Sequence, residues 1–194
     1  MKTTTSLKPI CLAFALLLSS SVTSILQAAD VNAFIAETLP IDLTVGYAVR
    51  AVDVNADGQL DIAVVDSKRI VWLEAPTWTT HVIFETPAGS ADNVCMAPHD
   101  VDGDGLVDFA IGFDWQPNNT TGGGKIGWVR QLAKDQWQYF DIAQEPTTHR
   151  MHWYQPSVGS PWSLIVAPLK GKGTAGPGFD QTGVRLMAYQ PSID

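Results

Sequence analysis

The chain has 194 residues, of which 45% are hydrophobic and 16% charged, a composition typical of a compact globular protein. Its formal net charge of −8 repels nucleic-acid phosphates and anionic lipid, so the sequence predicts neither a nucleic-acid partner nor a membrane-surface partner.

Residues 1–28 have the three-part pattern of a secretory signal peptide. Lys2 and Lys8 come first, an apolar run covers 10–18, and small residues continue to Ala28. The apolar run is too short to span a bilayer. We therefore expect signal cleavage and an exported product, in the periplasm or outside the cell, formed by residues 29–194.

That product keeps a single cysteine, Cys95, because the other cysteine of the chain lies within the signal peptide. An intrachain disulfide is then excluded. Cys95 is expected to be a small buried apolar residue on a strand rather than a reactive thiol.

Two acidic stretches, VDVNADGQLDIAVV (52–65) and HDVDGDGLVDFAIG (99–112), repeat with a constant offset of 47 residues. The offset pairs four oxygen-bearing positions of the first stretch with four of the second: Asp53 with Asp100, Asn55 with Asp102, Asp57 with Asp104, and Asp61 with Asp108.

After the acidic loop of each stretch come three segments rich in β-branched and apolar residues, which predict strands. These segments are 60–66, 69–76 and 80–86 in the first unit, and 107–113, 125–131 and 137–143 in the second. A period near 50 residues with several short strands per unit is typical of propeller blades.

A third unit keeps the strand pattern without the acids. Residues 154–169 and 183–191 match the first two strands, and uncharged residues replace the acidic ones: Gln155, Ser157, Gly159 and Ser163. The expected fold class is therefore all-β. It is a partial β-propeller of about three blades, near 45–90, 91–146 and 147–191. Free strand edges favour association, so further blades or a partner chain would be needed to close the propeller.

The acidic spacing D-x-N-x-D-G-x-x-D predicts calcium-binding loops, because hard Ca²⁺ takes several oxygen ligands from alternate residues of such a loop. The flanks argue against an EF-hand, since strands are expected on both sides of the loops and Val64 and Ile111 stand at the twelfth position. The alternative is Asx-turn chemistry without metal. The predicted Ca²⁺ ligands are Asp53, Asn55, Asp57, Asp61, Asp100, Asp102, Asp104 and Asp108.

Two histidines are candidates for a second metal site. His99 directly precedes the second acidic loop, and His149 precedes the strand of the third unit. If both approach the central channel from neighbouring blades, they could hold Zn²⁺ or another divalent ion. The alternative is that both are hydrogen-bonded structural residues. His152 is a second-rank ligand, and His81 is expected to be a surface or packing residue.

The loop-and-strand units DVNADGQLDIAVV and DVDGDGLVDFAIG resemble the FG-GAP or VCBS repeats of secreted β-propellers. A narrower resemblance rests on longer segments. DNVCMAPHDVDGDGLVDFAIG, GGGKIGWVRQ, EPTTHRMHW and LIVAPLKGKGTAGPGFDQTGVRLMAY are similar to the propeller domain of aldos-2-ulose dehydratases. That resemblance implies a seven-bladed propeller whose metal-dependent site dehydrates 1,5-anhydrofructose and related sugars.

Under this resemblance the function is that of a carbohydrate lyase, in which a metal polarises the C2 carbonyl and acidifies the C3 hydrogen. A base removes that hydrogen while an acid helps hydroxide leave from C4. His99 and His149 would be ligands or proton carriers, Asp100 or Glu145 the carboxylate, and Arg150 a contact to a substrate oxygen. Trp115 and Trp153 are candidate sugar platforms.

Two further readings stay open. The chain holds about three of the blades that the dehydratase resemblance implies, so it could be an inactive fragment of such an enzyme. Alternatively, the protein is a non-catalytic, calcium-stabilised extracellular propeller that binds a protein or a glycan.

Overall fold

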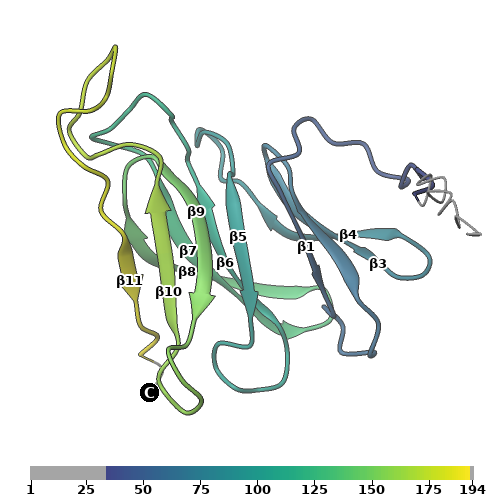
Figure 1. The fold of residues 1–194 in the computed structure, drawn as a ribbon. Helices are drawn as coiled ribbons and strands as arrows, with labels where there is room; N and C mark the ends of the chain where they lie inside the picture. The colour runs from purple at the N-terminus through teal and green to yellow at the C-terminus, as the bar shows by residue number, and fades with distance from the viewer. Residues whose placement is uncertain (1–33, 193–194) are drawn as a thin grey trace, which may run out of the picture. The chain divides into compact units, whose positions relative to one another are not determined.

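A computed structural model describes residues 34–192 (Figure 1). The predicted signal peptide lies outside the described residues. The chain divides into the units Met1–Thr38 and Leu39–Asp194. Residues 34–38 of the first unit are exposed coil, and the described part of the second unit is built from strands and loops. Within residues 34–192, the structure contains no helix long and apolar enough to cross a membrane.

The second unit contains three antiparallel sheets with four, four and three strands (Figure 1). The first has the order β1-β2-β3-β4, with strands Ala48–Val52, Asp61–Val65, Arg69–Glu74 and Thr79–Glu85. The second has the order β5-β6-β7-β8, with strands Cys95–His99, Asp108–Phe113, Lys125–Ala133 and Gln136–Gln144. The third has the order β11-β10-β9, with strands Thr148–Tyr154 (β9), Ser163–Pro168 (β10) and Met187–Tyr189 (β11). The expected all-β fold of three blade-like units is confirmed.

Strand β6 shows how the sheets pack together. Every residue of this strand is buried, because both faces of its sheet are covered. Phe109, Ile111 and Phe113 join a core cluster with residues of the first sheet, whereas Ala110 joins a cluster with residues of the third. Successive side chains of a strand point to opposite faces, so this run serves two interfaces at once. Each large side chain buried here stabilises the fold by about 2 kcal/mol.

The sequence pattern did not predict the first strand of each sheet. These strands are β1, β5 and β9. These strands pair only with the second strand of their sheet, and in β5 the sequence contains Pro98. Proline cannot donate to a strand ladder, but it is tolerated on an edge strand. Each sheet is therefore a meander that begins one strand before its loop.

The strand registers identify equivalent positions in the three sheets. Three first-strand residues face the first residue of the second strand: Val52 faces Asp61, His99 faces Asp108, and Tyr154 faces Ser163. Tyr154, rather than His149, is thus the third-sheet counterpart of His99.

Cys95 is the first residue of β5 and is 2% exposed. Burial raises the pKa of its thiol to about 12. The strand opposite has Gly112 at the paired position, where an added Cβ would lie 2.6 Å from the Cys95 Sγ. Cys95 is a buried, free thiol, as the sequence predicts.

Candidate metal centre

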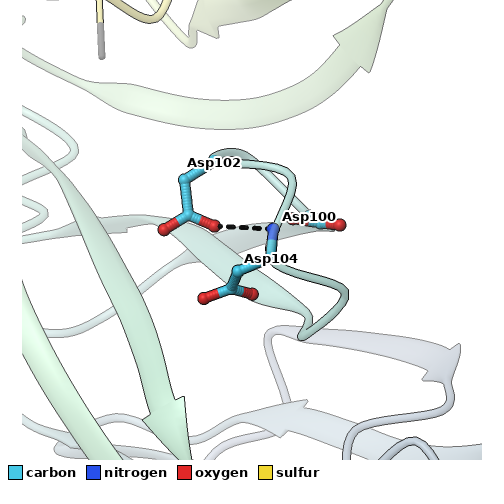
Figure 2. Close-up of side chains that lie close together, drawn as sticks. All are labelled: Asp100, Asp102 and Asp104. Carbon is cyan, nitrogen blue, oxygen red and sulfur yellow. Dashed lines mark hydrogen bonds between the residues drawn. The ribbon is translucent and has the colours of Figure 1, made fainter. Parts of the chain in front are cut away.

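The loop that joins β5 to β6 brings three carboxylates together. Asp100, Asp102 and Asp104 each offer an oxygen, and these oxygens lie within 4.8 Å of one another (Figure 2). In the part of the chain that the structure describes, no other three acidic, histidine or cysteine side chains come together so closely. We call these residues the aspartate triad.

Backbone amides of the same loop hold the triad in place. Asp100 accepts the amide of Gly103 at 2.8 Å and that of Gly105 at 3.0 Å. Asp102 accepts the amide of Asp104 at 3.3 Å, the contact drawn as a dashed line in Figure 2, and Asp104 accepts that of Leu106 at 2.9 Å. These are the local turns that aspartate favours, so part of each carboxylate is satisfied without metal.

Asp102 has an oxygen that those turns do not satisfy. Its side chain is 4% exposed, and its buried Oδ2 accepts no hydrogen bond from any residue in 34–192. The Arg130 guanidinium forms an ion pair with this oxygen, without the geometry of a hydrogen bond. It also lies 3.6 Å from an Asp104 oxygen. This oxygen is already paired with Arg130, and it lies beside two further carboxylates, so the three acids form an oxygen-rich cluster of the kind that Ca²⁺ prefers.

The predicted ligands Asp61 and Asp108 lie beside the loops, not within the aspartate triad. Both are fully buried at the start of the second strand of their sheets. Asp61 accepts the amides of Val54 and Ala75, each at 2.9 Å. Asp108 accepts those of Val101 at 3.2 Å and Gln131 at 2.8 Å. Both carboxylates therefore fasten the loop and the end of the third strand to the second strand.

Burial raises the pKa of the Asp108 carboxyl to about 6. The amide of Gln131 is the first of the groups that oppose this shift, since a hydrogen bond to a carboxylate favours its charged form. A cation near Asp108 would act in the same direction as this amide.

The first acidic loop is organised differently. Asp53 accepts the amides of Asp57 and Gly58 at 3.1 and 2.8 Å. The Asn55 side chain donates to the Asp57 carboxylate at 3.2 Å and to Glu74 at 3.0 Å. The Asn55 amide therefore donates to acidic oxygens at the position where the second loop has the carboxylate of Asp102.

The structure does not bring His99 and His149 together. His99 is the last residue of β5, and its ring lies 4.3 Å from that of Trp162 and 5.3 Å from that of Trp153 between ring centroids. The His149 ring stacks on that of Trp115, with 5.7 Å between ring centroids. Trp115 forms an isolated β-bridge with Asp92, a residue that precedes the start of β5. The length of β5, about 13 Å at the usual rise per residue, therefore separates the surroundings of the two rings.

Burial lowers the pKa of His99 and of His149, and the nearby Arg150 adds to the effect at His149. Both imidazoles are thus held toward the neutral form. Neutral imidazole can ligate a metal, but it is equally suited to packing against tryptophan.

The other candidate catalytic residues make their contacts outside the aspartate triad. Arg150 is exposed and donates to the His149 carbonyl at 2.8 Å. Glu145 is buried and forms an ion pair with Arg185 at 3.2 Å. His152 is exposed on β9. Neither Arg150 nor Glu145 lies in the aspartate triad.

The structure places the remaining aromatic candidates in different surroundings. Trp153 is 8% exposed and donates its indole N–H to the Ala97 carbonyl at 3.1 Å, so its ring is part of the core and not an open sugar platform. Trp115 is half-buried between His149 and Tyr47. His81 stacks on Trp72 at 4.4 Å, which confirms it as a packing residue.

Sequence reasoning missed Arg130 and Glu74, the charged residues that contact the two loops. Glu74 is the last residue of β3, and Arg130 is the sixth of the nine residues of β7. Extending the repeat alignment from the loops to the third strands would have placed them at the same position.

Comparison with known proteins agrees with this geometry. Residues 53–111, which span both acidic loops, match the FG-GAP-like repeat family. The chain is thus an all-β protein that contains an FG-GAP-like repeat within its antiparallel sheets. A search of curated proteins found no match.

Proposed function

We propose that the protein is an exported, calcium-stabilised propeller module that binds a protein or a glycan and has no catalytic role of its own. The observation that supports this most directly is the aspartate triad, with the buried Oδ2 of Asp102 beside two further carboxylates. In this proposal Ca²⁺ neutralises the triad and fixes the loop between β5 and β6. The sheets then present their connecting loops as a binding surface.

The placement of the histidines is the main argument for a binding module over an enzyme. A metal ligated by His99 and His149 would require two rings that lie near opposite ends of β5. Metal–nitrogen bonds are about 2.0–2.1 Å long for Zn²⁺, so the two rings cannot share one ion in this arrangement. The dehydratase activity that the resemblance implies would therefore need a centre built from other residues.

Calcium titration by calorimetry tests the proposal. Wild-type protein should bind Ca²⁺, and Asp104→Ala should weaken binding because the triad loses one of its three carboxylates. Glu85→Ala, which removes an exposed acid of β4 outside both loops, is the matched control and should bind as the wild type does. Absence of calcium binding by the wild type would overturn the proposed function.

Turnover distinguishes the module from the lyase. The protein would be incubated with 1,5-anhydrofructose and divalent metal, and the unsaturated product followed by its ultraviolet absorbance. The proposal expects no product. Product formation that is lost in both His99→Ala and His149→Ala would favour the dehydratase instead.

A further inference from the structure

The two acidic loops face opposite charges at one equivalent position of the third strand. Trp72 pairs with Ala63 in the first sheet, and Trp128 pairs with Ala110 in the second. Counting two residues onward from each tryptophan places Glu74 and Arg130 at matching positions. The residues that follow them confirm the match, because the backbone amide of Ala75 donates to Asp61 and that of Gln131 donates to Asp108.

In the first sheet this position adds a negative charge that is already neutralised. Glu74 accepts the Lys134 ammonium at 2.6 Å and lies 2.9 Å from His81. It also accepts the Asn55 amide of the first loop. The first loop therefore meets a carboxylate whose charge is balanced from the turn between β7 and β8.

In the second sheet the same position supplies a cation to the loop itself. The Arg130 guanidinium contacts Asp102 and lies 3.6 Å from Asp104, so it faces two of the three triad carboxylates. The Arg130 side chain is 35% exposed, whereas that of Asp102 is 4% exposed. The exposed side of the guanidinium gives it a route into solvent when another cation arrives.

We propose that Arg130 is a built-in competitor of Ca²⁺ for the aspartate triad, so that the second loop binds calcium more weakly than its carboxylates alone would. This inference rests on the proposed calcium binding. Without calcium, the single charge of Arg130 offsets part of the negative charge on Asp102 and Asp104. Calcium entry displaces the guanidinium, because both cations need the same carboxylate oxygens.

Arginine suits this role because its guanidinium is planar and offers several N–H donors to carboxylate oxygens. The second loop would therefore need a higher calcium concentration for half-occupancy, while its calcium-free state keeps an ion pair at Asp102.

The test is calcium calorimetry on the Asp57→Ala background, which disables the first loop so that only the second is observed. Arg130→Gln should bind Ca²⁺ about two- to fivefold more tightly, the size expected for removing one partly exposed charge pair. Arg130→Lys should stay near the wild-type affinity because it keeps the charge. Arg185→Gln, which removes an arginine paired with Glu145 outside the loops, is the matched control.

A second readout uses melting temperature in chelator. Arg130→Gln should melt lower than the background protein, since the triad then has no cation, and saturating calcium should remove the difference. Equal calcium affinity and equal melting temperature in chelator for Arg130→Gln and its background would overturn the inference while leaving the proposed function intact. Absence of calcium binding in every variant would overturn both.

Discussion

The Asp108 carboxylate accepts the backbone amide of Gln131 at 2.8 Å, a contact that joins the start of β6 to β7 from inside the sheet. Asp61 repeats it with Ala75 at 2.9 Å in the first sheet. A carboxylate in this position satisfies a buried amide and links the acidic loop to the third strand. The acids of the repeat therefore fall into two groups. Most accept backbone amides within the turn of their own loop, whereas Asp61 and Asp108 join the loop to the neighbouring strands.

The raised pKa of Asp108 gives a pH dependence whose sign can be worked out. Its folded pKa of about 6 exceeds the ordinary 3.8, so the folded protein binds this proton more tightly than the unfolded chain does. The contribution to stability is complete below pH 4 and is lost as the pH rises to 6, by up to about 3 kcal/mol.

Asp108→Asn should remove this loss, although it also removes one acceptor at every pH. In chelator, the unfolding free energy of the variant relative to the wild type should therefore improve between pH 4 and pH 6. Urea unfolding at both pH values measures it. Parallel curves for the two proteins would show that Asp108 does not titrate in this range.

The two loops differ in backbone strain at one equivalent position. Ala56 has a φ of 58° where Gly103 has a φ of 77°. A left-handed conformation costs a residue with a Cβ about 1 kcal/mol. Ala56→Gly should accordingly stabilise the protein by up to about 1 kcal/mol, and Gly103→Ala should destabilise it by a similar amount.

The denaturant midpoint measures both changes. An added Cβ at Gly103 meets nothing within 4 Å, so steric contact would not contribute to the result. A stabilising Gly103→Ala would contradict the assigned backbone conformation.

Trp153 should be a structural residue of the interface between β9 and β5. Trp153→Phe removes the indole donor to the Ala97 carbonyl and should destabilise the protein by about 1–2 kcal/mol, the range for leaving a buried acceptor unpaired. Trp162→Phe is the matched control, because Trp162 also contacts His99 but is 37% exposed. It should cost less than about 0.5 kcal/mol. Equal costs in thermal unfolding would contradict the assignment.

His81 should couple the first sheet to the turn of the second. One ring nitrogen lies 2.9 Å from Glu74 of β3, and the other lies 2.8 Å from Asp135, between β7 and β8. A double-mutant cycle with His81→Ala and Asp135→Ala should give a coupling energy of about 0.5–1 kcal/mol. The control cycle pairs His81→Ala with Glu85→Ala and should give none. Additive effects in the first cycle would mean that the contact contributes nothing.

Most of the strands could be predicted from the sequence because their residues are β-branched or apolar and turn residues bound them. Strand β6 is the clearest case, since burial on both faces makes its sequence continuously apolar. Strand β9 could not be predicted in the same way. It alternates polar, exposed residues such as His152 with buried ones such as Trp153, and its bulge at His149 breaks the period.

The site was predictable to the extent that it is local. Asp100, Asp102 and Asp104 lie on one tight turn, so their spacing alone places their oxygens together. The contact of Arg130 with Asp102 depends on sheet register across 28 residues of chain, which no local pattern records. The separation of His99 from His149 depends on the register between neighbouring sheets in the same way.

Melting temperature with and without calcium tests the central claim most directly. If the acidic loops bind calcium in the folded state, Ca²⁺ at about 100 times its dissociation constant adds roughly 2.7 kcal/mol to stability. For a chain of this size that raises the melting temperature by about 5–10 °C over the value in chelator. The increase should shrink in Asp100→Asn and Asp104→Asn and persist in Glu85→Ala. Equal melting temperatures of the wild type in excess Ca²⁺ and in excess chelator would contradict the account and leave the acidic loops as metal-free turns.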